Sequence, residues 1–124
     1  MKAINKLQRD ALDMAMQGVA AELGVNIYTL RDSFFERDKA MEYGVNWSAQ
    51  GTQDAETTLA YAQKLTKAAE ICKVLNSLEM ATNYADDPQP ESLETFKKKA
   101  EDLKNIILMG VDAEFVELAI DKIQ

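Results

Sequence analysis

The chain of 124 residues has no histidine and a single cysteine, Cys72. Without histidine, the commonest general base and the commonest metal ligand are both absent, so no Ser-His or Cys-His nucleophile can be assembled. A lone cysteine cannot form an intramolecular disulfide, and the apolar neighbours of Cys72 predict a small core residue. Glycine-rich phosphate loops are missing too. These absences predict a protein that is not an enzyme and holds no cofactor and no metal.

Paired carboxylates leave one enzymatic alternative. Glu91 and Glu94 are three residues apart, as are Glu114 and Glu117, so each pair lies near one helix face where Mg²⁺ could bind. To that extent they resemble the pairs of all-α nucleotide pyrophosphohydrolases. The second Glu-x-x-Asp half of that pattern is absent, because Asp121 follows Glu117 by four residues. We therefore do not expect a magnesium-dependent reaction.

Positive charge is scarce in the chain. Fourteen Lys and Arg stand against 21 Asp and Glu, which gives a net charge of -7. This excess disfavours general attraction to nucleic acid or to an anionic membrane. The basic cluster Lys97-Lys98-Lys99 has Glu94 and Glu101 nearby, which indicates a solvated helix face. No N-terminal run has the length of a signal peptide or a membrane span, so we expect a cytoplasmic protein with no membrane partner.

Helix breakers are also few. Two prolines and five glycines are spread among abundant Ala, Leu, Met, Lys and Glu, and no segment alternates as a strand would. The length suits one domain with an ordinary core. We predict an all-α, single-domain bundle of about five helices around one long central helix. Its parts are an N-terminal helical hairpin (1–44), the long helix (52–85) and C-terminal helices (91–124).

Apolar periodicity places the individual helices. The first should cover residues 2–23, with Gly24 as its C-cap and Asn26 as the N-cap of a second helix that ends near Gly44. The long helix should reach Tyr84, before the break at residues 86–90. A helix over 91–109 should end at Gly110, and Asp112 should cap the last one. Core-facing residues are expected to be Ile4, Leu7, Ala11, Met14, Ala15 and Val19; Tyr61, Leu65, Ala68, Cys72 and Leu75; Ile71, Val74, Leu78 and Ala81; Leu93, Phe96, Ala100, Leu103 and Ile107; and Phe115, Ala119 and Ile123.

Residues 19–34 have the layout of a helix-turn-helix. The small residue Ala20 stands where two helices would meet, Gly24 lies in the turn, and Val25 and Leu30 are at the apolar positions that fix the angle. Over these sixteen residues the chain resembles the helix-turn-helix of bacterial repressors of the lactose-repressor type. The resemblance implies our alternative function, a DNA-binding transcriptional regulator that uses residues 19–35. Its DNA contacts would come from Tyr28, Thr29 and Arg31.

Other residues of the same segment disfavour DNA binding. Ile27 is apolar where the repressors offer polar groups to bases, and Ser33 replaces an apolar anchor of the recognition helix. Asp32, Glu36 and Asp38 would face phosphate with their own negative charge. We favour a plain helical hairpin with a glycine C-cap and an asparagine N-cap as the interpretation of this pattern. A helix-turn-helix shape used for protein contact is a further alternative.

Aromatic residues point to association with protein. Trp47 and Tyr43 lie at or next to the loop predicted after Gly44, and such residues are frequent binding anchors, although Trp47 could instead cover the end of the bundle. Phe34 and Phe35 are consecutive, so they cannot both face the same core. We predict a non-catalytic acidic protein that binds another protein, with a homodimer as one option. It also fits the character of a phage or mobile-element accessory or regulatory factor. The predicted binding surface is Arg31, Phe35, Tyr43 and Trp47.

Overall fold

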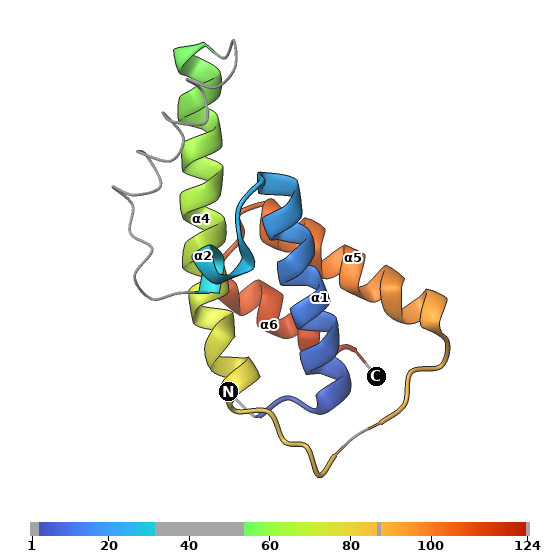
Figure 1. Cartoon of the computed structure of the whole chain (residues 1–124). Helices are drawn as coiled ribbons and strands as arrows, with labels where there is room; N and C mark the ends of the chain where they lie inside the picture. Colours follow the sequence, from blue (N-terminus) through green and yellow to red (C-terminus); the bar gives the residue numbers. More distant parts are fainter. Residues whose placement is uncertain (1–2, 32–53, 87, 124) are drawn as a thin grey trace.

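The computed structural model describes residues 3–31, 54–86 and 88–123, and most of these residues lie in α-helices (Figure 1). The helices are α1 (Lys6–Leu23), α2 (Ile27–Arg31), α4 (Ala55–Met80), α5 (Leu93–Leu108) and α6 (Ala113–Asp121). The described ranges contain no strand beyond an isolated bridge between Asn5 and Asn83. The predicted all-α class is therefore confirmed. No helix in these ranges is both long enough and apolar enough to cross a membrane.

Helix α1 begins later than predicted because Asn5 caps it. The Asn5 side chain accepts a hydrogen bond from the Gln8 backbone N–H (2.8 Å), and the Gln8 side chain accepts one from the Asn5 N–H (3.0 Å). This reciprocal arrangement satisfies two N–H groups that a helix start leaves without partners. The residue before the cap, Ile4, accepts a hydrogen bond from the Asn83 N–H (2.8 Å), so the chain there pairs with the segment after α4.

The turn after α1 has the two caps that the sequence predicts. Gly24 has a φ of 70°, which is the left-handed conformation that glycine adopts without steric cost. The Asn26 side chain accepts a hydrogen bond from the Tyr28 N–H (2.8 Å) at the start of α2. The hairpin geometry is thus encoded locally.

Helix α4 is shorter at both ends than the predicted range. At its start, Asp54 accepts a hydrogen bond from the Thr57 N–H (2.7 Å), and this bond lowers the pKa of Asp54 below its ordinary 3.8. At its end, the Thr82 hydroxyl donates to the Glu79 carbonyl (2.7 Å), and the next N–H, that of Asn83, is used by Ile4. Both ends are therefore fixed by polar groups that compete with helix continuation.

Helix α1 lies between α4 and α5 and also contacts α2 and α6 (Figure 1). Its most extensive packing is against α5. The N-terminal part of α4 extends beyond α1 in Figure 1. The predicted arrangement around one long central helix is not confirmed, because α1 occupies the middle of the described helices.

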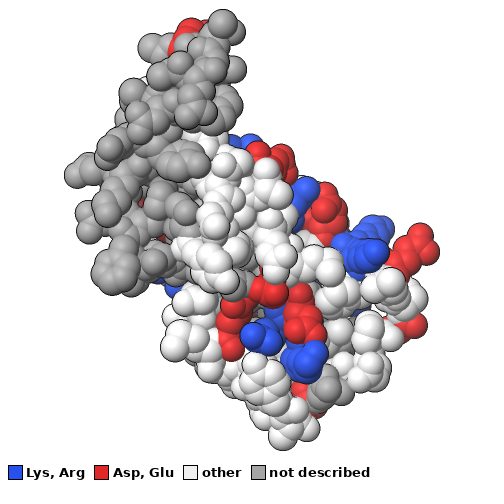
Figure 2. All heavy atoms as spheres, viewed as in Figure 1, with Lys and Arg blue, Asp and Glu red and all other residues white. Residues whose placement is uncertain are grey.

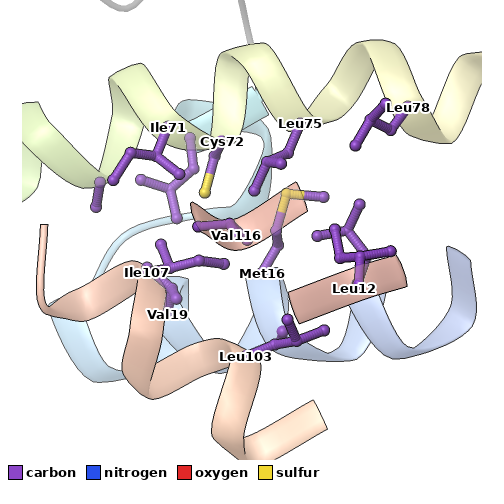
Figure 3. Close-up of a cluster of buried hydrophobic side chains, with 14 of the residues drawn as sticks. Leu12, Met16, Val19, Ile71, Cys72, Leu75, Leu78, Leu103, Ile107 and Val116 are labelled. Atoms are coloured by element: carbon purple, nitrogen blue, oxygen red, sulfur yellow. The ribbon is translucent and has the colours of Figure 1, made fainter. Parts of the chain in front are cut away.

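The core is formed by side chains from α1, α4, α5 and α6 that point toward one another (Figure 3). Cys72 is fully buried among them, as predicted. Leu65, Ala68 and Leu75 of the same predicted stripe are buried as well. Tyr61, which heads the stripe, is half-buried, and its hydroxyl donates to the Leu23 carbonyl (2.6 Å). The labelled core residues are Leu12, Met16, Val19, Ile71, Cys72, Leu75, Leu78, Leu103, Ile107 and Val116.

Several predicted core positions are wrong. Met14 is exposed, whereas Leu12 and Met16 are buried, because α1 has neighbours on more than one side and buries more than one stripe. On α4, Ile71 and Leu78 are buried as predicted, but Val74 is exposed. Ala81, the first residue after α4, and Leu93, the first residue of α5, are exposed too.

The C-terminal helices show a further difference. Helix α5 starts after Ser92, whose side chain accepts a hydrogen bond from the Thr95 N–H (3.0 Å), and it buries Ala100, Leu103 and Ile107 as predicted. Asp112 stands at the N-cap of α6 without a capping hydrogen bond from its side chain, and it lies 3.8 Å from the Lys67 ammonium. The residues that α6 and its C-terminus bury are Val116, Ile120 and Ile123, so the prediction of Phe115 as a core residue is wrong.

Gln8 connects the start of α1 to the end of α6, and its replacement with glutamate should destabilise the fold. The Gln8 Nε2 donates to the carbonyls of Ile120 (3.1 Å) and Ile123 (3.3 Å). Glutamate keeps the acceptor for the Asn5 N–H but places a carboxylate beside the two carbonyl oxygens. We expect Gln8→Glu to lower the free energy of unfolding by about 2 kcal/mol in urea titrations.

The matched control for this variant lies on the same helix. Gln17 is exposed and its Nε2 donates to the Asp13 carboxylate (3.1 Å), so Gln17→Glu makes the same chemical change in contact with water. It should change the free energy of unfolding by about 0.5 kcal/mol or less. Equal losses in Gln8→Glu and Gln17→Glu would contradict a structural role for the bonds to α6.

Lys104 links α5 to α1, and its positive charge should stabilise the fold until the ammonium loses its proton at alkaline pH. Its Nζ lies 2.7 Å from Glu101 and 3.4 Å from Glu22, and its stem crosses Gly18, where a Cβ would lie 2.8 Å from the Lys104 Cδ. The hydrogen bond to Glu101 raises the pKa of Lys104 above its ordinary 10.5, with Glu22 adding to the effect. The stabilisation is therefore complete below pH 10.5 and is lost as the pH rises through the folded-state pKa.

Thermal unfolding of the wild type and of Lys104→Met tests this expectation. The wild type should be the more stable protein near neutral pH, and the difference should shrink above pH 10.5. Lys98→Met, at an exposed position of the same helix, controls for general effects of alkali. A difference between wild type and Lys104→Met that does not change with pH would contradict the role of the charge.

Candidate protein-binding groove

Helix α6 is held against the bundle by one of its faces and leaves large apolar side chains on another. Gly110, with a φ of 74°, ends α5, and α6 returns along it (Figure 1). Val116 and Ile120 are four residues apart and are both fully buried. Phe115 and Leu118 consequently point away from the core and are 62% and 59% exposed.

These two side chains border a groove between α5 and α6. The groove has a volume of about 590 Å³ and is larger than the hollow of about 230 Å³ beneath residues 88–93. Most of its wall is apolar, and three charged side chains stand along it. The lining residues are Lys99, Asp102, Leu103, Ile106, Phe115, Leu118, Ala119, Lys122 and Ile123.

The side chains that line the groove determine which contacts it can make. Its wall offers apolar contact and a few charges, but the lining residues include no nucleophile with an adjacent base. Among the described residues no group of three or more Cys, Asp or Glu side chains lies close enough to hold a metal ion. The lone cysteine, Cys72, is buried in the core. What the groove can do is cover apolar side chains of another molecule.

The surface predicted from the sequence lies mostly outside the described residues. Phe35, Tyr43 and Trp47 fall within 32–53, and Arg31 ends α2 with a side chain that is also outside the description. The structure therefore does not test whether these residues form one surface. That surface stays a prediction.

Of the three residues predicted to contact DNA, the structure describes the side chain of one. Tyr28 is 70% exposed at the start of α2, whereas the side chains of Thr29 and Arg31 are outside the description. Leu30 is fully buried and Ile27 packs against the core, so α2 is fastened to the bundle through these residues. On the face drawn in Figure 2, basic and acidic side chains alternate among the coloured atoms without a broad basic field.

Comparisons of the chain with protein-family models, with curated proteins and with solved structures gave no match. The class of protein is therefore defined by the structure alone. It is a helical bundle in which an apolar groove between the last two described helices is open to solvent.

The sequence contained a signal for this groove that the periodicity alone did not reveal. Residues 113–121 include Phe115, Val116, Leu118 and Ile120 within nine positions. These side chains are spread around more of the helix than a single packed face can bury. The prediction that Phe115 is a core residue hid this excess of apolar side chains on α6, because it left the largest of them out of the expected surface.

Proposed function

We propose that this chain is a non-catalytic protein that acts by binding another protein, and that the partner occupies the groove between α5 and α6. The observation that carries the proposal is the exposure of Phe115 and Leu118 beside an apolar groove. Scattered exposed apolar residues are ordinary, but a contiguous group at a concave site is typical of a binding surface. Burial of such a group contributes about 25 cal/mol per Å² of apolar area.

The shape and the rim of the groove support a protein partner. A groove between two helices fits the apolar face of a third helix, whose anchors recur at three- and four-residue spacing. Lys99, Asp102 and Lys122 stand along the groove and can form the polar rim that surrounds the apolar centre of most interfaces. A cytoplasmic location and a role as a phage or mobile-element accessory factor belong to the same proposal, and the single cysteine is compatible with a reducing compartment.

The proposal is tested by selection from a displayed library of helical peptides against the full chain. Peptides with apolar residues at three- and four-residue spacing should be enriched, and they should bind the purified protein and compete with one another for one site. Failure to enrich any peptide beyond the level found with a denatured sample would contradict a protein-binding groove.

The alternative function is a DNA-binding regulator that uses residues 19–35. Its support is the turn geometry, with Gly24 at a positive φ and Asn26 capping α2, together with the exposure of Tyr28. Titration of labelled duplex DNA at low and at physiological salt tests it by fluorescence anisotropy. Binding that falls steeply with salt and is weakened by Arg31→Ala would favour the regulator, and no binding at low salt would exclude it.

A further inference from the structure

The exposed face of α6 carries three side chains in a row, with Leu118 at the centre and opposite charges at the two ends. Glu114 lies four residues before Leu118 and Lys122 four residues after it, and all three side chains are exposed. Each charge is therefore about 6 Å from Leu118 along the helix axis, in opposite directions. Residues four apart lie near one face of a helix, so the three form a stripe with an acid at one end and a base at the other.

Such a stripe is complementary to itself when two copies meet antiparallel. With Leu118 of one copy against Leu118 of the other, each Lys122 faces a Glu114 across the two-fold axis. The same contact appears twice, as a two-fold interface requires. Phe115 is one residue from Glu114 and lies on the groove wall, so the pairing would also cover the Phe115 rings.

The net charge of the chain opposes self-association, so the reciprocal Glu114–Lys122 contacts must outweigh it. The whole chain carries -7, which makes two copies repel each other in general. Around the groove and on α6, Lys99 and Lys122 stand against Asp102, Glu114, Glu117 and Asp121, so this part of the surface keeps a small excess of negative charge. Charges elsewhere are screened beyond about 8 Å at physiological ionic strength.

We propose that the groove binds a second copy of this chain, and that two antiparallel α6 helices meet at Leu118 with reciprocal Glu114–Lys122 contacts. The inference rests on the proposed function, because it names the protein that occupies the same groove. Self-association then covers Phe115 and Leu118 on both copies.

Charge reversal at the two ends of the stripe tests the geometry. In Glu114→Lys two lysines would face each other at both ends of the interface, and in Lys122→Glu two glutamates would do so. Sedimentation equilibrium of the full chain should show a monomer–dimer equilibrium for the wild type and a dimer dissociation constant raised about 10-fold or more in each single variant. The double variant Glu114→Lys/Lys122→Glu should return to the wild-type value.

Mixing the two single variants gives the sharpest result. Each lysine-bearing stripe then meets a glutamate-bearing one, so an equimolar mixture should form heterodimers with about the wild-type dissociation constant. Since the two positions are exposed, circular dichroism should show unchanged helicity, and Lys98→Glu on α5 is the matched charge change away from the stripe. A mixture that associates no better than the single variants would overturn the antiparallel pairing.

The outcome for the wild type separates this inference from the function on which it rests. A wild type that remains monomeric at every concentration, while selected peptides still bind the groove, would overturn the homodimer and leave the protein-binding function standing. A monomer that also binds no selected peptide would overturn both.

Discussion

Replacement of Leu75 with alanine is expected to lower the free energy of unfolding by about 3 kcal/mol. Leu75 is fully buried on the face of α4 that packs into the core, where it lies with Met16 and Val116 (Figure 3). The loss combines the transfer of the removed methyl groups with the cavity left between helices that cannot fully close. Urea titration followed by circular dichroism measures it, and such a loss is a large fraction of the stability of a small domain.

The adjacent residue on the same helix provides the control. Val74 is 48% exposed, so Val74→Ala removes apolar atoms that are already partly in water. It should change the free energy of unfolding by about 0.5 kcal/mol or less. Equal losses from Leu75→Ala and Val74→Ala would mean that the face of α4 that packs into the core has been assigned wrongly.

Leu118→Asp is expected to weaken the binding of a selected peptide by about 100-fold or more. The substitution removes an apolar anchor and puts a carboxylate where apolar side chains of the partner must lie, a change that costs about 3 kcal/mol. The fold should persist, because Leu118 is 59% exposed and contributes little to the core. Isothermal titration calorimetry measures the dissociation constant, and thermal unfolding checks that the variant is native.

Val74→Asp is the matched variant for binding. It introduces the same carboxylate at an exposed apolar position of α4, away from the residues that line the groove. The peptide affinity should stay within about 2-fold of the wild type, because long-range repulsion between exposed charges is screened. If Val74→Asp and Leu118→Asp weaken binding equally, the effect comes from net charge and the groove is not the binding surface.

The parts of the fold that depend on neighbouring residues could be predicted from the sequence. Gly24 and Asn26 act on the backbone within a few residues, so the end of α1 and the start of α2 follow from residue type alone. The buried stripe of α4 that contains Cys72 was predictable because its apolar spacing is regular over several turns.

Features that depend on contacts distant in the sequence could not be predicted. The chain after α4 pairs with the segment before α1 through the hydrogen bond from the Asn83 N–H to the Ile4 carbonyl. The burial of Leu12 beside Met16 follows from the position of α1 between two other helices. Local periodicity contains neither fact, because both depend on which elements meet in space.

The candidate groove was missed for a related reason. The four-residue spacing of Phe115, Ala119 and Ile123 fits one helix face. The rotation of α6 about its axis is decided by how the helix packs on the bundle, and there Val116 faces inward. Because neighbouring helix residues point in different directions, an error of one residue in the buried face of α6 places Phe115 in the core when it lies on the surface. The aromatic residues near Trp47 that were predicted instead lie outside the described part of the chain.

The central claim is that a protein partner binds between α5 and α6, and methyl NMR of the chain during addition of a selected peptide tests it most directly. The methyl signals of Ile106, Leu118 and Ile123, which line the groove, should shift and saturate together. The signals of Val74 and of the exposed Leu59 on α4 should stay in place. Shifts at the α4 positions with unchanged groove signals would contradict the account.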